Sequence, residues 1–245
     1  MRVGVIQSCF IPWRGYFDFV RSVDLFVFYD DVQYSKNGWR NRNQIKTPQG
    51  LRWITVPVRH RSLTQLICET EIDNREDWRA AHARLWADNY GHTPYYQDVL
   101  ALIGNLGLGV VETISKLNIA LTREIAAYLG IETQLMLSSD VELCGSKTDR
   151  LIDLLVKVKA KSYLSGPSAD AYLDKEVFRH AGIGLEYKSY DYEPYPQQWG
   201  AFDGAVTVLD LIANCGPASR DFLASRSPNQ VVVPPAQPTL AIERN

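Results

Sequence analysis

The sequence predicts an α/β protein with a Rossmann-like, mostly parallel sheet, helices on both faces of that sheet, and an inserted helical lobe. Short apolar runs of strand length alternate with longer stretches of helical periodicity, a pattern that favours a parallel sheet. The length of 245 residues, with 46% hydrophobic and 22% charged residues, is typical of a soluble globular chain with a large core.

The first quarter of the chain predicts a strand-helix-strand crossover. Residues 3–6 and 25–29 are apolar runs typical of buried strands, and the second run ends at Asp30-Asp31. Residues 16–23 can form a short helix between them. Because two parallel strands need a long crossover connection, this order predicts a parallel pair.

The middle of the chain is helical, and the third quarter alternates again. Apolar residues recur at helical spacing over 78–86 and 114–129, where Gly130 provides a stop. Strands follow at 133–137, 162–165 and 185–187, with helices at 146–159 and 169–181 between them. We predict one α/β domain over residues 1–230 with a helical lobe around residues 70–130. Residues 231–245, which are rich in proline, form a flexible tail in this prediction.

Charge and composition exclude some classes of function. The net charge of −2 disfavours nonspecific coating of nucleic acid, which depends on a basic surface. The chain begins with strand-like sequence instead of a secretion signal, and no apolar run approaches the ~18 residues of a membrane span. These features predict a cytoplasmic protein. The four scattered cysteines and the spacing of the histidines and acids predict neither a disulfide framework nor a metal site.

One segment is strongly basic. Residues 32–68 contain no Asp or Glu, although the chain as a whole is nearly neutral. The aromatic residues Tyr34, Trp39 and Trp53 are interleaved with the bases, which suits a ligand that is part phosphate and part flat ring or sugar. A solvated basic face that protects an edge strand is the alternative. The bases are Lys36, Arg40, Arg42, Lys46, Arg52, Arg59 and Arg61.

Within this segment, Asn41-Arg42-Asn43 with Lys46 predicts a binding site for a polar ligand. Two amides that flank a guanidinium can donate and accept hydrogen bonds around one ligand, whereas a structural turn needs only one Asn. Pro57 places the strand around residues 53–58 at a sheet edge or ends its pairing.

The loop after the first strand is a second candidate site. In open α/β sheets, ligands lie at the carboxyl ends of the strands, where helix amides can meet an anion. Pro12-Trp13-Arg14-Gly15-Tyr16 is loosely similar to the Pro-x-x-Gly-His turn of nucleotidylyltransferases, with Tyr16 in place of the histidine. Cys9 can act as a nucleophile if a histidine lies nearby, but a free Cys is more often a small buried residue.

Further candidates follow other predicted strands. Asp30-Asp31 can supply a general base or bind Mg²⁺, or can form a turn. Gly145 to Arg150 and Tyr163 to Ala169 are small-residue turns at helix amino ends, where backbone amides can hold an anion, although plain N-caps explain them equally well. We expect Arg42, Lys46, Lys147 and the turn near Gly166 to converge on one cleft.

The order of these segments resembles the WbqC-like family over about residues 3–225. The resemblance implies a bacterial protein of O-antigen or other surface-polysaccharide biosynthesis, and an aminoacyl transferase acting on an amino sugar. The family's first loop usually begins Gln-Pro, whereas Gln7 is followed here by Ser8-Cys9. If that loop contacts the substrate, the departure implies a different one. The matching motifs are Pro12-Trp13-Arg14-Gly15-Tyr16-Phe17-Asp18, Asp30-Asp31-Val32-Gln33-Tyr34-Ser35-Lys36, residues 39–50, Gly145-Ser146-Lys147-Thr148, Tyr163-Leu164-Ser165-Gly166, and Val208-Leu209-Asp210-Leu211-Ile212 with Asn214 and Gly216.

The leading hypothesis is a transferase of a small acyl or aminoacyl group to an amine on a nucleotide-linked sugar. Nucleotidyl transfer or ATP-dependent activation is one alternative, and a noncatalytic nucleotide-sugar-binding partner is another. The ligand is a small anionic molecule, and the sequence predicts no particular cofactor. The predicted catalytic residues are Asp30, Asp31 and Lys36. The predicted substrate-binding residues are Gln7, Pro12, Trp13, Tyr16, Gln33, Tyr34, Trp39, Asn41, Arg42, Asn43, Lys46, Lys147, Thr148, Ser165 and Gly166.

Overall fold

A six-stranded, mostly parallel sheet organises the protein. The computed structural model describes residues 1–104 and 111–236. The sheet has the order β5-β2-β1-β6-β7-β8, and only the β7–β8 pair is antiparallel. This is the strand order of a doubly wound Rossmann-like sheet, so the predicted fold class is confirmed. The strands are β1 (Arg2–Ile6), β2 (Leu25–Phe28), β5 (Gln134–Leu137), β6 (Ser162–Ser165), β7 (Gly184–Tyr187) and β8 (Gln230–Val233).

Helices cover both faces of this sheet because the apolar side chains of its strands point alternately to either side. Val27 packs in one cluster with α5 (Lys147–Lys157) and α6 (Lys175–Ala181). Its neighbours Phe26 and Phe28 pack on the opposite face with α1 (Arg14–Arg21). The helix expected at 169–181 is divided into a 3₁₀ turn, η3 (Pro167–Ala171), and α6, because Asp174 caps a new helix start.

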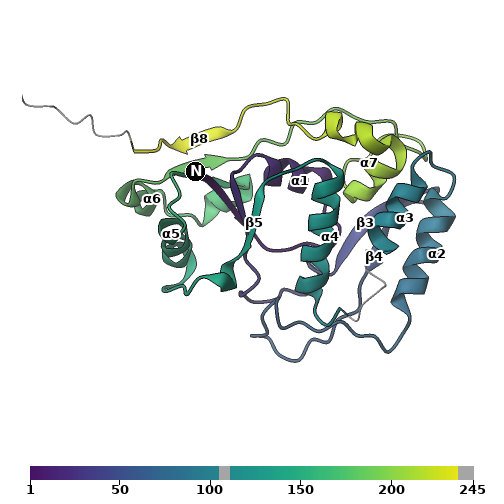
Figure 1. The fold of residues 1–245 in the computed structure, drawn as a ribbon, viewed down its shortest axis with the longest axis horizontal. Coiled ribbons are helices and arrows are strands. Elements are labelled where there is room, and N and C mark those ends of the chain that lie inside the picture. Colours follow the sequence, from purple (N-terminus) through teal and green to yellow (C-terminus); the bar gives the residue numbers. More distant parts are fainter. Residues whose placement is uncertain (105–110, 237–245) are drawn as a thin grey trace, which may run out of the picture.

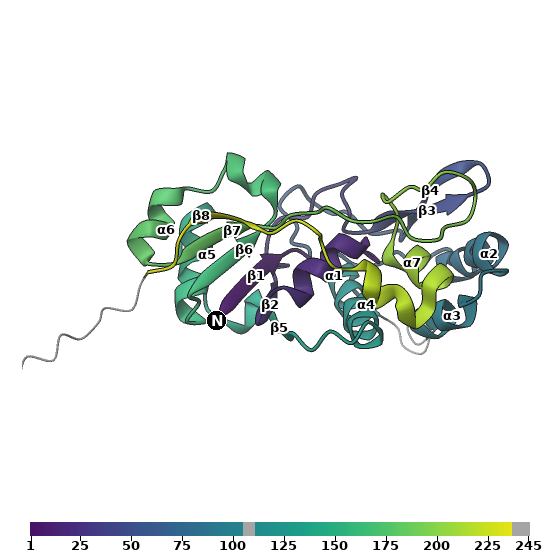
Figure 2. The same cartoon turned by 90° about the horizontal axis from the view of Figure 1, so that it is seen from above.

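A lobe with its own apolar core stands beside the sheet. It contains the antiparallel hairpin of β3 (Arg42–Thr47) and β4 (Gly50–Thr55), with α2 (Trp78–Tyr90), α3 (Tyr96–Gly104), α4 (Ile114–Tyr128) and α7 (Val208–Cys215). Figures 1 and 2 show α5 and α6 at one end of the molecule and α2, α3, α7 and the hairpin at the other. Two further 3₁₀ turns are η2 (Ser138–Asp140) and η4 (Gly216–Phe222).

The lobe and the sheet both extend beyond the predicted ranges. The lobe recruits the hairpin and α7 from outside residues 70–130, since their apolar residues join the same core. The last strand, β8, occupies positions expected in the tail, because the run Val231-Val232-Val233 joins the sheet as an edge strand that pairs with β7. Residues 237–245 of the predicted tail lie outside the described residues. Pro57 follows the end of β4 at Thr55, as expected for a strand that stops pairing there.

Across the described ranges, none of the helices has both the length and the apolar character that crossing a bilayer requires. All four cysteines are free thiols; Cys9 and Cys215 are buried, whereas Cys68 and Cys144 are exposed.

The packing of α2 on β4 predicts a pH-dependent stability. His82 Nε2 lies 2.9 Å from the carbonyl oxygen of Thr55, and burial lowers the pKa of His82 below its ordinary value of 6.5. The unfolded chain therefore binds this proton first as the pH falls. We expect His82 to contribute its full stability above pH 6.5 and to lose it as the pH falls from 6.5 through the lower folded pKa.

Urea unfolding of the wild type and of His82→Gln at pH 7.5 and pH 5.5 checks this expectation. The stability of the wild type relative to the variant should fall between the two pH values. The comparison cancels the contributions of the other histidines. A difference that stays constant with pH would therefore contradict a half-buried His82 that is neutral in the folded protein.

Candidate functional site

The loop after β1 lies where ligands bind in this class of sheet. The strand order runs from β1 through β2 to β5 in one direction and from β6 to β7 in the other. The order therefore reverses between β1 and β6, and ligands of open α/β sheets lie at the carboxyl ends of the strands beside such a reversal. Residues 7–13, called the first loop below, begin at this point.

Buried polar side chains fix the first loop to its neighbours. The Ser8 amide donates to Asp30 Oδ1 at 2.7 Å, and the Ser115 hydroxyl of α4 donates to Asp30 Oδ2. Asn118 Nδ2 donates to Ser8 Oγ at 3.2 Å and to the Arg40 carbonyl at 2.8 Å. Because both oxygens of the buried Asp30 carboxylate accept a hydrogen bond, the geometry favours a structural role for this predicted catalytic residue.

The hairpin holds the other half of the first loop. Asn43 Nδ2 donates to the carbonyl oxygens of Phe10 at 3.1 Å and Ile11 at 2.7 Å, and the Phe10 amide donates to the Trp39 carbonyl at 2.9 Å. Ile11 has a φ of 34°, a left-handed conformation that a β-branched residue rarely adopts. The surroundings therefore impose the shape of this loop.

A pocket opens on one side of the first loop. We call it the first-loop pocket; its volume is about 370 Å³. The exposed Trp13 and Trp39 line it, and they retain 36% and 46% of their accessible surface. Five predicted substrate-binding residues meet here. The lining residues are Cys9, Pro12, Trp13, Tyr16, Trp39, Asn43, Gly204 and Ala205.

A positive charge lies close to this pocket. Arg40 Nη1 donates to Gln7 Oε1 at 2.7 Å, and the buried Arg40 Nε has no hydrogen-bond partner among the described residues. Burial raises the pKa of the Cys9 thiol, and the nearby Arg40 charge opposes that shift. Burial also raises the pKa of Tyr16 well above its usual value. Cys9 and Tyr16 therefore line the pocket as a protonated thiol and phenol, and the charge of Arg40 lies near them although Arg40 itself is not a lining residue.

A second polar group lies at the carboxyl ends of β2 and β5. Asp31 accepts hydrogen bonds from Arg150 Nη2 and from the Ser138 hydroxyl. The Arg150 guanidinium also lies 5.0 Å from the centre of the Tyr29 ring. The Asp31 and Arg150 side chains retain 18% and 20% of their surface, so the pair is reachable from solvent.

The predicted motif around Asn41 and Lys46 is mostly structural. Asn41 Oδ1 accepts from the Tyr34 hydroxyl at 3.0 Å, and its Nδ2 donates to the Val56 carbonyl at 2.8 Å. Lys46 is buried; its Nζ donates to Gln197 Oε1 at 2.8 Å and to the carbonyl of Ala201. These side chains fix the hairpin to neighbouring segments.

The same region encloses a buried acid. Asp210 of α7 accepts hydrogen bonds from Gln197 and from the hydroxyls of Tyr90 and Tyr195, each of the two hydroxyls at 2.7 Å. Burial raises the pKa of Asp210, and these hydrogen bonds oppose the rise. This network joins α2 and α7 in the interior of the lobe.

The expected convergence on one cleft does not occur. Lys46 is buried in the lobe, whereas Lys147 is exposed at the start of α5, at the opposite end of the molecule (Figure 2). Arg42 lies 4.3 Å from the centre of the Trp53 ring and donates to the Asn37 carbonyl. The correction has a physical reason: the basic segment forms a hairpin and loops that pack on the lobe, so its charges point in several directions.

The other predicted residues are scattered along the sheet edge and the loops. Gln33 Nε2 donates to the carbonyl of Leu63, and Lys36 is exposed in the same connection. Thr148 lies in the first turn of α5 and is half-buried. Ser165 is buried at the end of β6, and Gly166 follows it.

Four residues of this site are not among the substrate-binding residues that the sequence predicts. The sequence indicates Cys9 only as a candidate nucleophile, and it places Arg40 in the basic segment without showing which base faces the first loop. Gly204 and Ala205 complete the pocket from a loop about 150 residues after the hairpin and carry no chemical signal of their own. Among the residues with described structure, no group of three or more His, Cys, Asp or Glu side chains is arranged to hold a metal ion.

A comparison with protein-family models identifies the family. The model of the WbqC-like protein family matches residues 7–222. The chain is 45% identical over 225 residues to the uncharacterized protein Rv1507c of Mycobacterium tuberculosis, an alignment that covers 91% of this chain and 97% of that protein. No solved structure matches the chain.

The role of Asn43 leads to a stability prediction. In Asn43→Ala, the buried carbonyls of Phe10 and Ile11 lose their donor, and an unsatisfied buried acceptor costs ~1–3 kcal/mol. We expect the free energy of unfolding to fall by about 2 to 4 kcal/mol. Denaturant unfolding measures this change, with the exposed Gln49→Ala as a control that should stay within about 0.5 kcal/mol of the wild type. A loss no larger than that of the control would show that Asn43 does not anchor the loop.

Proposed function

The chain belongs to the WbqC-like protein family, and on that premise we propose that it is an enzyme that transfers a small acyl or aminoacyl group to an amine of a nucleotide-linked sugar. The proposed setting is the biosynthesis of bacterial O-antigen or a related surface polysaccharide. The observation that carries the proposal is the first-loop pocket, an aromatic cavity beside the reversal point of a Rossmann-like sheet with a guanidinium close by.

The two exposed tryptophans of the pocket suit a flat or sugar-like ligand. Trp13 and Trp39 come from different loops and both line the cavity. Indole faces stack on bases and on the apolar faces of sugars, and base stacking contributes ~1–3 kcal/mol. The charge of Arg40 near Cys9 supports a phosphate or carboxylate on the ligand, since no carboxylate lies within ion-pair distance of Arg40 in the described part of the chain.

The proposed reaction needs a proton acceptor as well as a binding site. The amine nitrogen attacks the acyl carbonyl carbon, a C–N bond forms, and the bond from that carbon to its leaving group breaks with the electron pair departing on the leaving group. The amine loses one proton. Asp31 is the better proposed acceptor, because its side chain retains 18% of its surface and can be reached from solvent, whereas Asp30 is buried.

Ligand binding by aromatic and charged variants tests the proposal. We expect nucleotide sugars to raise the melting temperature of the wild type, since a ligand of the folded state stabilises it. Trp39→Ala should weaken this binding about tenfold through lost stacking. Arg40→Gln should weaken binding of the charged ligand in the same way. Tyr172→Ala removes an aromatic ring that is 71% exposed and outside the pocket, so it should bind as the wild type does.

The outcomes separate the competing functions. A mixture of an amino-sugar nucleotide with acyl or aminoacyl donors should yield the corresponding amide by mass spectrometry, and Asp31→Asn should remove that product while retaining binding. Pyrophosphate release from ATP or CTP with Mg²⁺, without amide formation, would replace acyl transfer with nucleotidyl transfer. Stabilisation by nucleotide sugars without any product would indicate a noncatalytic binding partner.

A further inference from the structure

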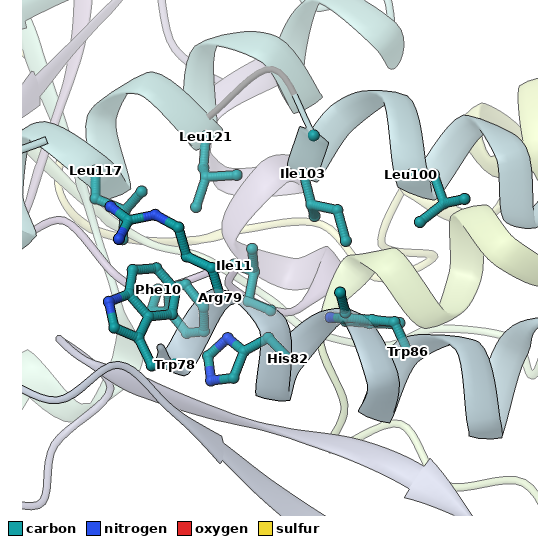
Figure 3. A pocket seen from close by; sticks show the side chains of 12 residues that line it. Phe10, Ile11, Trp78, Arg79, His82, Trp86, Leu100, Ile103, Leu117 and Leu121 are labelled. Carbon is teal, nitrogen blue, oxygen red and sulfur yellow. The ribbon is translucent and has the colours of Figure 1, made fainter. Parts of the chain in front are cut away.

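A second cavity lies on the other side of the first loop. We call it the lobe pocket; its volume is about 230 Å³, and it lies among α2, α3, α4 and the first loop. Figure 3 shows its side chains, nearly all of them apolar or aromatic. An engineered apolar cavity of about 150 Å³ stays dry and binds benzene, so this larger one can hold an apolar group. The lining residues are Phe10, Ile11, Trp78, Arg79, His82, Ala83, Trp86, Leu100, Ile103, Gly104, Leu117 and Leu121.

The lobe pocket has a charged end and an apolar end. Figure 3 shows the Arg79 side chain extending from α2 toward Leu117 of α4, while Leu100 and Ile103 of α3 lie at the far side beside Trp86. Arg79 and Trp86 are seven residues apart on α2, which corresponds to roughly 10 Å along the helix. The cavity is therefore elongated, with its cation near one end.

The Arg79 guanidinium makes one hydrogen bond among the described residues and has further N–H donors. Its Nη1 donates to Asn74 Oδ1 at 2.9 Å, and its guanidinium lies 4.4 Å from the centre of the Trp78 ring. In the described ranges, no carboxylate lies within 4.0 Å of it. A guanidinium has five N–H donors and favours a carboxylate, which it can bind through two hydrogen bonds.

His82, the other titratable side chain of the pocket, lines it with a neutral ring. His82 Nε2 is engaged with the carbonyl of Thr55, and burial lowers the pKa of His82. Arg79 is therefore the cation of this cavity. The remaining wall offers few hydrogen-bond partners, so a polar group placed deep inside would lose its hydration without compensation.

We propose that the lobe pocket binds a monocarboxylate with an unbranched apolar tail, its carboxylate on Arg79 and its tail toward Leu100 and Ile103. The site is independent of the proposed function, because the lobe pocket shares no lining residue with the first-loop pocket. Tail burial supplies the affinity, and the ion pair selects a carboxylate over an uncharged head.

Calorimetric titration of the full chain with three probes tests the site. Octanoate carries both the charge and the tail, octan-1-ol carries the tail alone, and acetate carries the charge alone. Octanoate should bind with a negative heat-capacity change, which marks apolar burial. Octan-1-ol should bind about tenfold more weakly, because it lacks the charge-assisted hydrogen bonds to Arg79. Acetate should show no binding.

Three variants of α2 locate the binding. Arg79→Gln should lower the affinity for octanoate to that for octan-1-ol, while Ala83→Leu should abolish binding of both by filling the cavity from an exposed helix position. Arg84→Gln removes an exposed arginine of the same helix that does not line the pocket and should bind as the wild type does. No octanoate binding, equal affinity for octanoate and octan-1-ol, or unchanged binding in Ala83→Leu would each overturn the proposal.

Discussion

The arrangement of both pockets depends on buried polar side chains that fix the backbone of the first loop. Asp30 accepts from the Ser8 amide, Asn118 donates to the Ser8 hydroxyl, and Asn43 donates to two consecutive carbonyls of the loop. Each of these groups is buried, where an unpaired donor or acceptor is costly. The constraint is strong enough to keep Ile11 in a left-handed conformation. These three anchors come from β3, from α4 and from the end of β2, so the loop joins the sheet to the lobe.

This constraint explains why one short loop faces two cavities. Phe10 and Ile11 contribute to the apolar lobe pocket, whereas Cys9, Pro12 and Trp13 contribute to the first-loop pocket. A loop at the carboxyl end of β1 lies where Rossmann-like sheets bind ligands, and here the lobe covers its other side. The two cavities differ in chemistry because each borders a different part of the protein. The first-loop pocket lies beside Arg40 and the polar loops, whereas the lobe pocket extends among the apolar faces of three helices.

The sequence predicts the sheet well and the lobe less well, and the difference is physical. Runs such as Leu25–Phe28 are apolar because both sheet faces are covered, so periodicity identifies them. The hairpin is polar and basic and gives no such signal. Five predicted ligand-binding residues line the first-loop pocket, but Asn41 and Lys46 bind parts of the protein instead. A sequence lists an amide or an ammonium without showing whether its partner is a ligand or a distant backbone carbonyl, and Gln197 lies about 150 residues after Lys46.

Amide hydrogen exchange of the first loop tests the central claim most directly. The Ser8 amide donates to Asp30 at 2.7 Å and the Phe10 amide donates to Trp39 at 2.9 Å, both in the interior. If the buried anchors hold the loop, these two amides exchange only when the protein unfolds globally. They are then protected as strongly as the amides of the central strands. Exchange of Ser8 and Phe10 as fast as that of the exposed Asn37 would contradict the account, because it would show a loop that opens without breaking the fold.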